Sequence, residues 1–161
     1  MEQNKFNALE VLEMAKEIEL KGKKFYKTYA DHYQEQELGE FLQKLATEEQ
    51  EHYDIFDRMS REVAEGNEEQ ANYLYDYQVS AYLRSLIEFT VFPEEIEVDE
   101  ELEDIEEILT IGIMAEKESI LFYQEILVHN QGKTAEILER LLAEEKKHLL
   151  DLTEYKTRLL K

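Results

Sequence analysis

The chain has 161 residues, the length of one domain, and its 39 acidic and 18 basic residues give a formal net charge of −21. It contains no cysteine, which excludes disulfides, thiolate nucleophiles, iron–sulfur clusters and Cys-based zinc sites, and so acidic a chain is not expected to bind nucleic acid. The first residues lack the basic start and apolar run of a signal peptide, and charged residues interrupt every apolar stretch, so we expect a cytoplasmic protein that does not enter a membrane.

One proline and five glycines leave few turn signals, which favours long helices. Apolar residues recurring with a period of 3.6 predict a first helix over about residues 7–31 and a second over about residues 35–65. The aromatic-rich segment that follows, residues 66–99, is expected to be a crossover with one or two helices of its own. A third helix is predicted over about residues 100–130, and a fourth from about residue 133 to the C-terminus.

The two predicted helix pairs repeat each other in sequence. Residues 40–52 align with residues 136–148 at an offset of 96, and residues 19–26 align with residues 116–123 at an offset of 97. The short connection within each pair predicts an antiparallel hairpin, and two such hairpins make one four-helix bundle.

We therefore predict an all-α fold in one domain over residues 1–161. It would be a four-helix bundle of two repeated helix hairpins, residues 7–65 and 100–161. The partly helical crossover over residues 66–99 would join them.

Each hairpin offers one glutamate from its first helix and a Glu-x-x-His sequence from its second. Residues three apart on a helix lie on the same face, so each Glu-x-x-His pair can direct a carboxylate and an imidazole to one point. The candidate metal ligands are Glu19, Glu49, His52, Glu116, Glu145 and His148.

Apolar and small residues surround these six positions, which predicts that the six side chains point inward. A buried carboxylate without compensation costs several kcal/mol, so four of them at one place require cations between them. Two divalent ions would balance four carboxylates, and two neutral imidazoles would complete the coordination. The sequence therefore predicts a two-metal site, with the ligand set of di-iron and di-manganese carboxylate bundles.

Two further pairs of residues accompany the candidate ligands. Tyr26 and Tyr123 each follow a candidate glutamate by seven residues, nearly two helical turns, and therefore share its stripe of the helix. Glu48 and Glu144 lie four residues before the histidines and could reach the site, but we expect them not to be ligands.

On these residues the chain resembles the rubrerythrin family of the ferritin-like superfamily, over nearly its whole length. The resemblance implies a ferritin-like bundle that holds two iron ions per site, although the same ligands would also accept manganese or a mixed pair. It implies that Tyr26 and Tyr123 support catalysis by hydrogen bonds that orient ligand carboxylates. It assigns terminal carboxylates to Glu19 and Glu116, bridging carboxylates to Glu49 and Glu145, and one imidazole for each metal to His52 and His148.

The chain departs from the family pattern at two places. Full-length rubrerythrins add a rubredoxin-like domain whose iron is held by four cysteines, and this chain has none, so electrons would come from a separate donor protein. Many rubrerythrins also carry an additional glutamate one turn after the third-helix ligand. That position is Ser119 here, and its equivalent in the first helix is Gly22, so a more symmetric site is expected.

The expected function is therefore that of a di-iron oxidoreductase that reduces hydrogen peroxide or O₂. One alternative is a ferroxidase or an iron-storage or iron-transfer protein with Fe(II) as its substrate, which would take up more than two irons per chain. Another is a non-enzymatic acidic bundle whose glutamates face water. The resemblance also leads us to expect a homodimer, in which the long crossover could let two subunits exchange helix pairs.

Overall fold

The computed structural model describes residues 5–66, 70, 72–88, 92 and 105–160. These residues form four long helices and a shorter one, and no named strand occurs among them. The helices are α1 (Ala8–His32), α2 (Glu37–Gly66), α4 (Tyr77–Glu88), α5 (Ile105–Val128) and α6 (Gly132–Leu159). None of them is long and apolar enough to span a bilayer. The prediction of an all-α four-helix bundle is confirmed.

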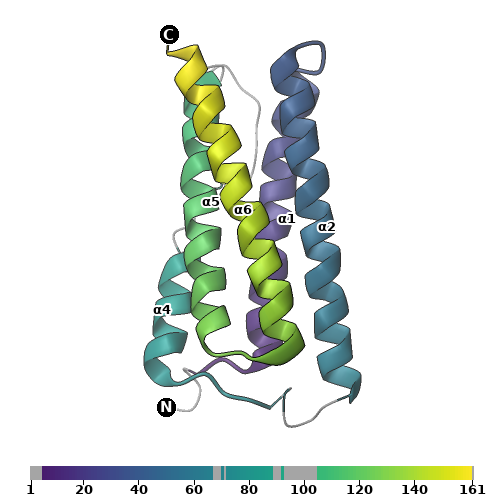
Figure 1. Ribbon diagram of the computed structural model, residues 1–161, viewed down its shortest axis with the longest axis vertical. Helices are drawn as coiled ribbons and strands as arrows, with labels where there is room; N and C mark the ends of the chain where they lie inside the picture. The colour runs from purple at the N-terminus through teal and green to yellow at the C-terminus, as the bar shows by residue number, and fades with distance from the viewer. Residues whose placement is uncertain (1–4, 67–69, 71, 89–91, 93–104, 161) are drawn as a thin grey trace.

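The four long helices lie side by side along the long axis of the molecule (Figure 1). α1 contacts α2 and α5, and α6 contacts α5 and α2, so the two hairpins pack against each other through the α1–α5 and α2–α6 seams. α4 supplies a helix within the predicted crossover. Parts of the predicted crossover lie outside the described residues, namely residues 67–69, 71, 89–91 and 93–99. The predicted start of the third helix near residue 100 also lies outside them.

Local chemistry sets the ends of the first hairpin. Asn7 caps α1: its side-chain oxygen accepts a 2.8 Å bond from the Glu10 amide, and the Glu10 carboxylate accepts a 3.2 Å bond from the Asn7 amide. At the turn into α2, a Cβ on Gly39 would lie 2.1 Å from the Tyr33 carbonyl oxygen. Only glycine permits this close approach, and the turn sets α2 antiparallel to α1.

The apolar core consists of two clusters, each built from all four long helices. One cluster includes Leu12, Phe56, Phe122 and Leu138. The other includes Phe25, Leu42, Leu109 and Leu152. Six buried carboxylate and imidazole side chains lie at intermediate positions along the same four helices, so apolar packing flanks them on both sides. Such packing keeps water away from the charged groups and strengthens their mutual interactions.

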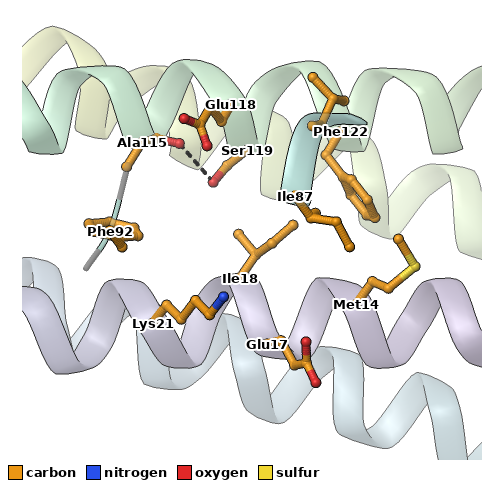
Figure 2. Close-up of a pocket in the computed structure, with 11 residues that line it drawn as sticks. Met14, Glu17, Ile18, Lys21, Ile87, Phe92, Ala115, Glu118, Ser119 and Phe122 are labelled. Atoms are coloured by element: carbon orange, nitrogen blue, oxygen red, sulfur yellow. Dashed lines mark hydrogen bonds between the residues drawn. The ribbon is translucent and has the colours of Figure 1, made fainter. Parts of the chain in front are cut away.

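α4 packs against α5 beside the α1–α5 seam. Leu83 and Val79 on α4 are buried there. A cavity of about 100 Å³ remains between α1, α4 and α5, and Ile18 and Ile87 project into it from opposite sides (Figure 2).

Candidate metal centre

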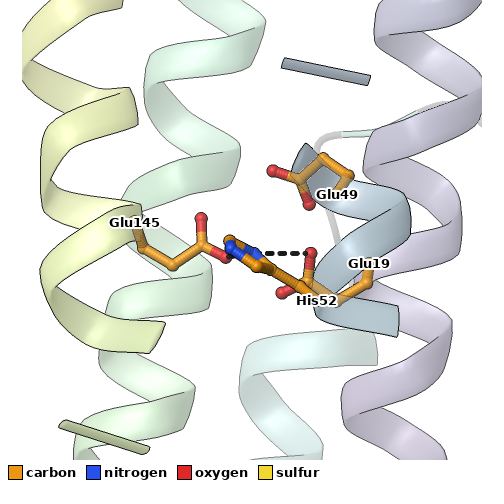
Figure 3. A group of neighbouring side chains, drawn as sticks. All are labelled: Glu19, Glu49, His52 and Glu145. Carbon is orange, nitrogen blue, oxygen red and sulfur yellow. Dashed lines mark hydrogen bonds and ion pairs between the residues drawn. The ribbon is translucent and has the colours of Figure 1, made fainter. Parts of the chain in front are cut away.

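The structure brings all six candidate ligands together in the middle of the bundle. Each is at most 4 % exposed. Their potential ligand atoms form two groups, within each of which the atoms lie no more than 4.8 Å apart. The first group, drawn in Figure 3, contains Glu19, Glu49, His52 and Glu145. The second contains Glu49, Glu116, Glu145 and His148.

Glu49 and Glu145 belong to both groups. They come from α2 and α6, on opposite sides of the α2–α6 seam. The Glu145 carboxylate lies 2.9 Å from Nδ1 of His52 and 3.4 Å from Nδ1 of His148, and the Glu49 carboxylate lies 3.3 Å from Nδ1 of His148. A carboxylate with one oxygen available to each of two ions is the usual bridge in di-iron bundles. Glu49 and Glu145 are thus shared by the two groups, whereas Glu19 and His52 belong only to the first and Glu116 and His148 only to the second.

The two imidazoles lie nearly parallel, with ring centroids 5.6 Å apart. Each directs Nδ1 into the cluster: Nδ1 of His52 is 2.9 Å from Glu145, and Nδ1 of His148 is 3.3 Å from Glu49. Nδ1 is therefore the nitrogen available to a metal.

The outer nitrogens are held by glutamates of the opposite hairpin. Nε2 of His52 is 2.5 Å from Glu144, and Nε2 of His148 is 2.5 Å from Glu48. A carboxylate on the far nitrogen of a ligating histidine fixes the ring and its tautomer and makes it a stronger ligand. The sequence analysis expected Glu48 and Glu144 to lie near the site without being ligands, and it did not indicate that each bonds an imidazole of the other hairpin.

The tyrosines also act across the pair of hairpins. Tyr26 on α1 donates a 2.8 Å hydrogen bond to Glu116 on α5, and Tyr123 on α5 donates a 2.5 Å bond to Glu19 on α1. Burial, reinforced by the neighbouring carboxylates, raises the pKa of both phenols well above its ordinary value. Both hydroxyls therefore keep their protons and serve as donors to the two carboxylates.

Without cations, the cluster binds protons strongly. Burial disfavours the charged imidazolium, but hydrogen bonds to the glutamates outweigh burial and raise the pKa of His52 and His148 to about 11. Burial, followed by the charges of nearby carboxylates, raises the pKa of Glu116 to about 8 and that of Glu49 well above its usual value. The raised pKa values of these four groups all favour bound protons, as expected where buried carboxylates have no metal cation to balance them.

Buried atoms without hydrogen bonds are a second indication that the donor set fits a pair of divalent metals. Among the described residues, several buried site atoms make no hydrogen bond: Oε2 of Glu19, Oε1 of Glu49, Oε2 of Glu145 and Nδ1 of His148. Buried polar atoms are normally paired, and these four belong to the two ligand groups. These atoms approach one another as carboxylate–imidazole pairs at 3.3–3.5 Å without forming hydrogen bonds, and carboxylate oxygens and imidazole nitrogens that converge in this way are the ligands that iron and manganese accept.

Gly22 and Ser119 occupy equivalent positions one turn after Glu19 and Glu116. A Cβ on Gly22 would lie 3.0 Å from Oε2 of Glu49, so the missing side chain leaves room for that carboxylate. The Ser119 hydroxyl donates a 3.1 Å bond to the Ala115 carbonyl on its own helix. Neither position adds a ligand, which agrees with the expected symmetry.

Comparison with known proteins identifies the family of the chain and a structure with the same fold. The family model described as Rubrerythrin matches residues 10–156. Among solved structures, a ferritin-like diiron-carboxylate protein from Thermotoga maritima has the same fold, with a TM-score of 0.72 and 24% sequence identity. The match covers 95% of this chain and 96% of that one. No curated protein gave a significant match.

Proposed function

The chain belongs to the rubrerythrin family, and from this premise we propose that it is a di-iron oxidoreductase that reduces hydrogen peroxide or O₂. The observation that carries the proposal is the buried set of four glutamates and two histidines, in which three carboxylate oxygens make no hydrogen bond. When bound there, two ferrous ions would supply the two electrons that, with two protons, convert peroxide to two waters, and a separate donor protein would restore them.

The proposed roles of the residues follow from their contacts. Glu49 and Glu145 would bridge the metals, while Glu19 and Glu116 would each complete one end of the pair. Tyr26 and Tyr123 fix the two terminal carboxylates by donating to one oxygen of each, which leaves the other oxygen for a metal.

The histidines would keep the site rigid on the α2–α6 side. Each ring is bonded through Nε2 to a glutamate of the other hairpin, so Nδ1 cannot turn away from the centre. A ligand shell held in this way needs little rearrangement when the metals change charge, which favours redox cycling. Glu48 and Glu144 are partly exposed, which connects both imidazoles to solvent through a carboxylate.

A ferroxidase with Fe(II) as its substrate would use the same ligands. The formal charge of −21 favours the approach of cations to the bundle. The two functions differ in stoichiometry: reduction of peroxide needs two irons per chain that stay bound, whereas iron storage or transfer needs more irons than the centre can hold.

The test is metal content followed by reoxidation. Protein purified and then loaded anaerobically with Fe(II) should hold about two irons per chain by mass spectrometry. Stopped-flow mixing of the reduced form with peroxide or O₂ should reoxidise the iron faster than free Fe(II) in the same buffer. A Glu49→Ala, Glu145→Ala double variant should lose both the metal and the reaction.

The matched control is the Glu51→Ala, Glu154→Ala double variant, which removes two exposed glutamates from the same two helices and should behave as wild type. Iron that exceeds two per chain and accumulates with each oxidation cycle would favour the ferroxidase. Absence of stoichiometric metal after reconstitution would refute both enzymatic functions. The further alternative of a non-enzymatic bundle would then remain, although its four glutamates are buried and do not face water.

A further inference from the structure

The cavity at the α1–α5 seam has an apolar inner wall. Its volume is about 100 Å³, and side chains from α1, α4 and α5 line it (Figure 2). The apolar residues that matter here are Met14, Ile18, Ile87, Phe92, Ala115 and Phe122. This space is small, and its wall presents mainly methyl groups and aromatic carbon.

Ser119 is the one polar side chain among the buried lining residues that the structure describes. Its hydroxyl donates to the Ala115 carbonyl and can therefore only accept a hydrogen bond from an occupant. The charged lining residues are Glu17, which is exposed, and Lys21 and Glu118, which are partly exposed, so charge borders the side of the cavity nearest to solvent. A buried water needs two to four polar partners, which apolar side chains do not offer, so the inner wall favours an apolar occupant.

Two residues that line the cavity are direct sequence neighbours of candidate ligands on α1 and α5. Ile18 and Ala115 directly precede Glu19 and Glu116, and the Phe122 ring lies edge-on to the Tyr123 ring at 5.9 Å. The imidazoles with their Nε2 partners fill the opposite, α2–α6 side. A small molecule in the cavity therefore lies on the α1–α5 side of the bundle, and the histidines lie on the other side.

We propose that this cavity binds O₂ beside the metal pair, a site that peroxide does not use. The proposal rests on the oxidant chemistry of the proposed function. An apolar cavity of about 150 Å³ in another protein binds benzene or xenon, so one of this size suits a molecule of two or a few atoms. Hydrogen peroxide would leave its hydrogen bonds unmade against such a wall, whereas O₂ makes none.

Xenon is a probe for the cavity that does not depend on catalysis. Crystals of the full chain, metal-free and metal-loaded, pressurised with xenon should show one xenon atom among Ile18, Ile87 and Phe122. Ile87→Phe should exclude xenon by filling the space from α4, and Leu86→Phe, from the neighbouring lining position, is a second variant in case the first does not fold. The control is Leu121→Phe, which adds the same ring at an exposed position of α5 outside the cavity.

The rates of iron reoxidation by O₂ and by peroxide then test whether only O₂ uses the cavity. In the reduced, iron-loaded protein, Ile87→Phe should slow reoxidation by O₂ roughly tenfold, because occupancy beside the centre falls, and leave the peroxide rate unchanged. Leu121→Phe should change neither rate. A cavity without xenon, or equal effects of Ile87→Phe on both oxidants, would overturn the proposal. Xenon binding in a protein that neither oxidant reoxidises would refute the proposed function and leave the gas site standing.

Discussion

Tyr123 on α5 donates a 2.5 Å hydrogen bond to Oε1 of Glu19 on α1, which ties the second hairpin to the first at the metal centre. Tyr26 and Glu116 make the equivalent bond in the opposite direction at 2.8 Å. Each of these two glutamates is thus held by a tyrosine from the other half of the sequence repeat.

Removal of the Tyr123 hydroxyl should weaken the centre while preserving the bundle. In Tyr123→Phe, the buried Glu19 carboxylate loses its donor and becomes free to rotate. Loss of such a supporting hydrogen bond typically lowers metal affinity by about 10- to 100-fold. Competition with a chelator measures the affinity, and circular dichroism checks the helix content.

Two further variants test whether the loss of metal affinity is specific to tyrosines that bond the candidate ligands. Tyr26→Phe should produce a loss of similar size, because Glu116 is held in the same way. Tyr155→Phe alters a partly buried tyrosine that stacks on Phe41 at the periphery and should have no effect on metal binding. Wild-type affinity in both site variants would show that these bonds do not position the ligands.

Glu144→Ala should reduce metal affinity although Glu144 is outside both ligand groups. The substitution removes the carboxylate on Nε2 of His52, so the ring loses its fixed orientation and part of its basicity. A decrease of about 10- to 100-fold is expected, with the reduced metal affinity visible in the same chelator competition. Glu154→Ala, an exposed change on the same helix, is the control. An unchanged affinity would mean that His52 is oriented by packing alone.

The sequence predicted the helices and the six converging residues because helix faces depend only on spacing along one chain. Periodicity identified four long helices, and the repeat identified Glu19 with Glu116 and the two Glu-x-x-His pairs. Spacing within one helix says nothing about the rotation of its neighbour. Hydrogen bonds from the tyrosines to ligand carboxylates were expected from the resemblance, but their crossing to the other hairpin, as from Tyr26 to Glu116, was not predictable. The cavity was not predictable either, because α4, which lines it, has no counterpart in the repeat.

Metal should stabilise the protein more as the pH rises. In the metal-free chain, the pKa of each histidine is raised from 6.5 to about 11. The protonated histidines therefore contribute fully to the stability of the fold below pH 6.5, and this contribution is lost as the pH rises through 11. The pKa of Glu116 is raised from 4.5 to about 8, which affects stability in the same direction, and its contribution is lost as the pH rises through 8. Each group contributes at most about 1.4 kcal/mol per pH unit.

The metal-free protein should therefore melt at a lower temperature at pH 8.5 than at pH 6.5. Bound metal replaces these protons and binds more tightly at higher pH, so the metal-dependent increase in Tm should grow over the same interval. Differential scanning calorimetry with and without Mn²⁺, which avoids iron oxidation, measures both trends. The Glu49→Ala, Glu145→Ala variant should show no increase in Tm with metal. An increase that shrinks with pH in the wild type would contradict proton displacement at the site.

Gly22→Ala should separate the geometry of the site from the stability of the helix. Alanine is favoured over glycine inside a helix by about 1 kcal/mol, so the substitution by itself stabilises α1. The new Cβ would lie 3.0 Å from Oε2 of Glu49, however, and the carboxylate would have to move away. We therefore expect weaker metal binding without a fall in the Tm of the metal-free protein.

The control for Gly22→Ala is Gly66→Ala, at the end of α2, where a Cβ would meet no atom within 4 Å. Metal affinity by chelator competition should fall in Gly22→Ala only. Because Glu49 belongs to both ligand groups, its displacement should weaken both metals together and not one of them. Loss of a single metal would instead mean that Glu49 serves one ion, and the bridging assignment would then be wrong.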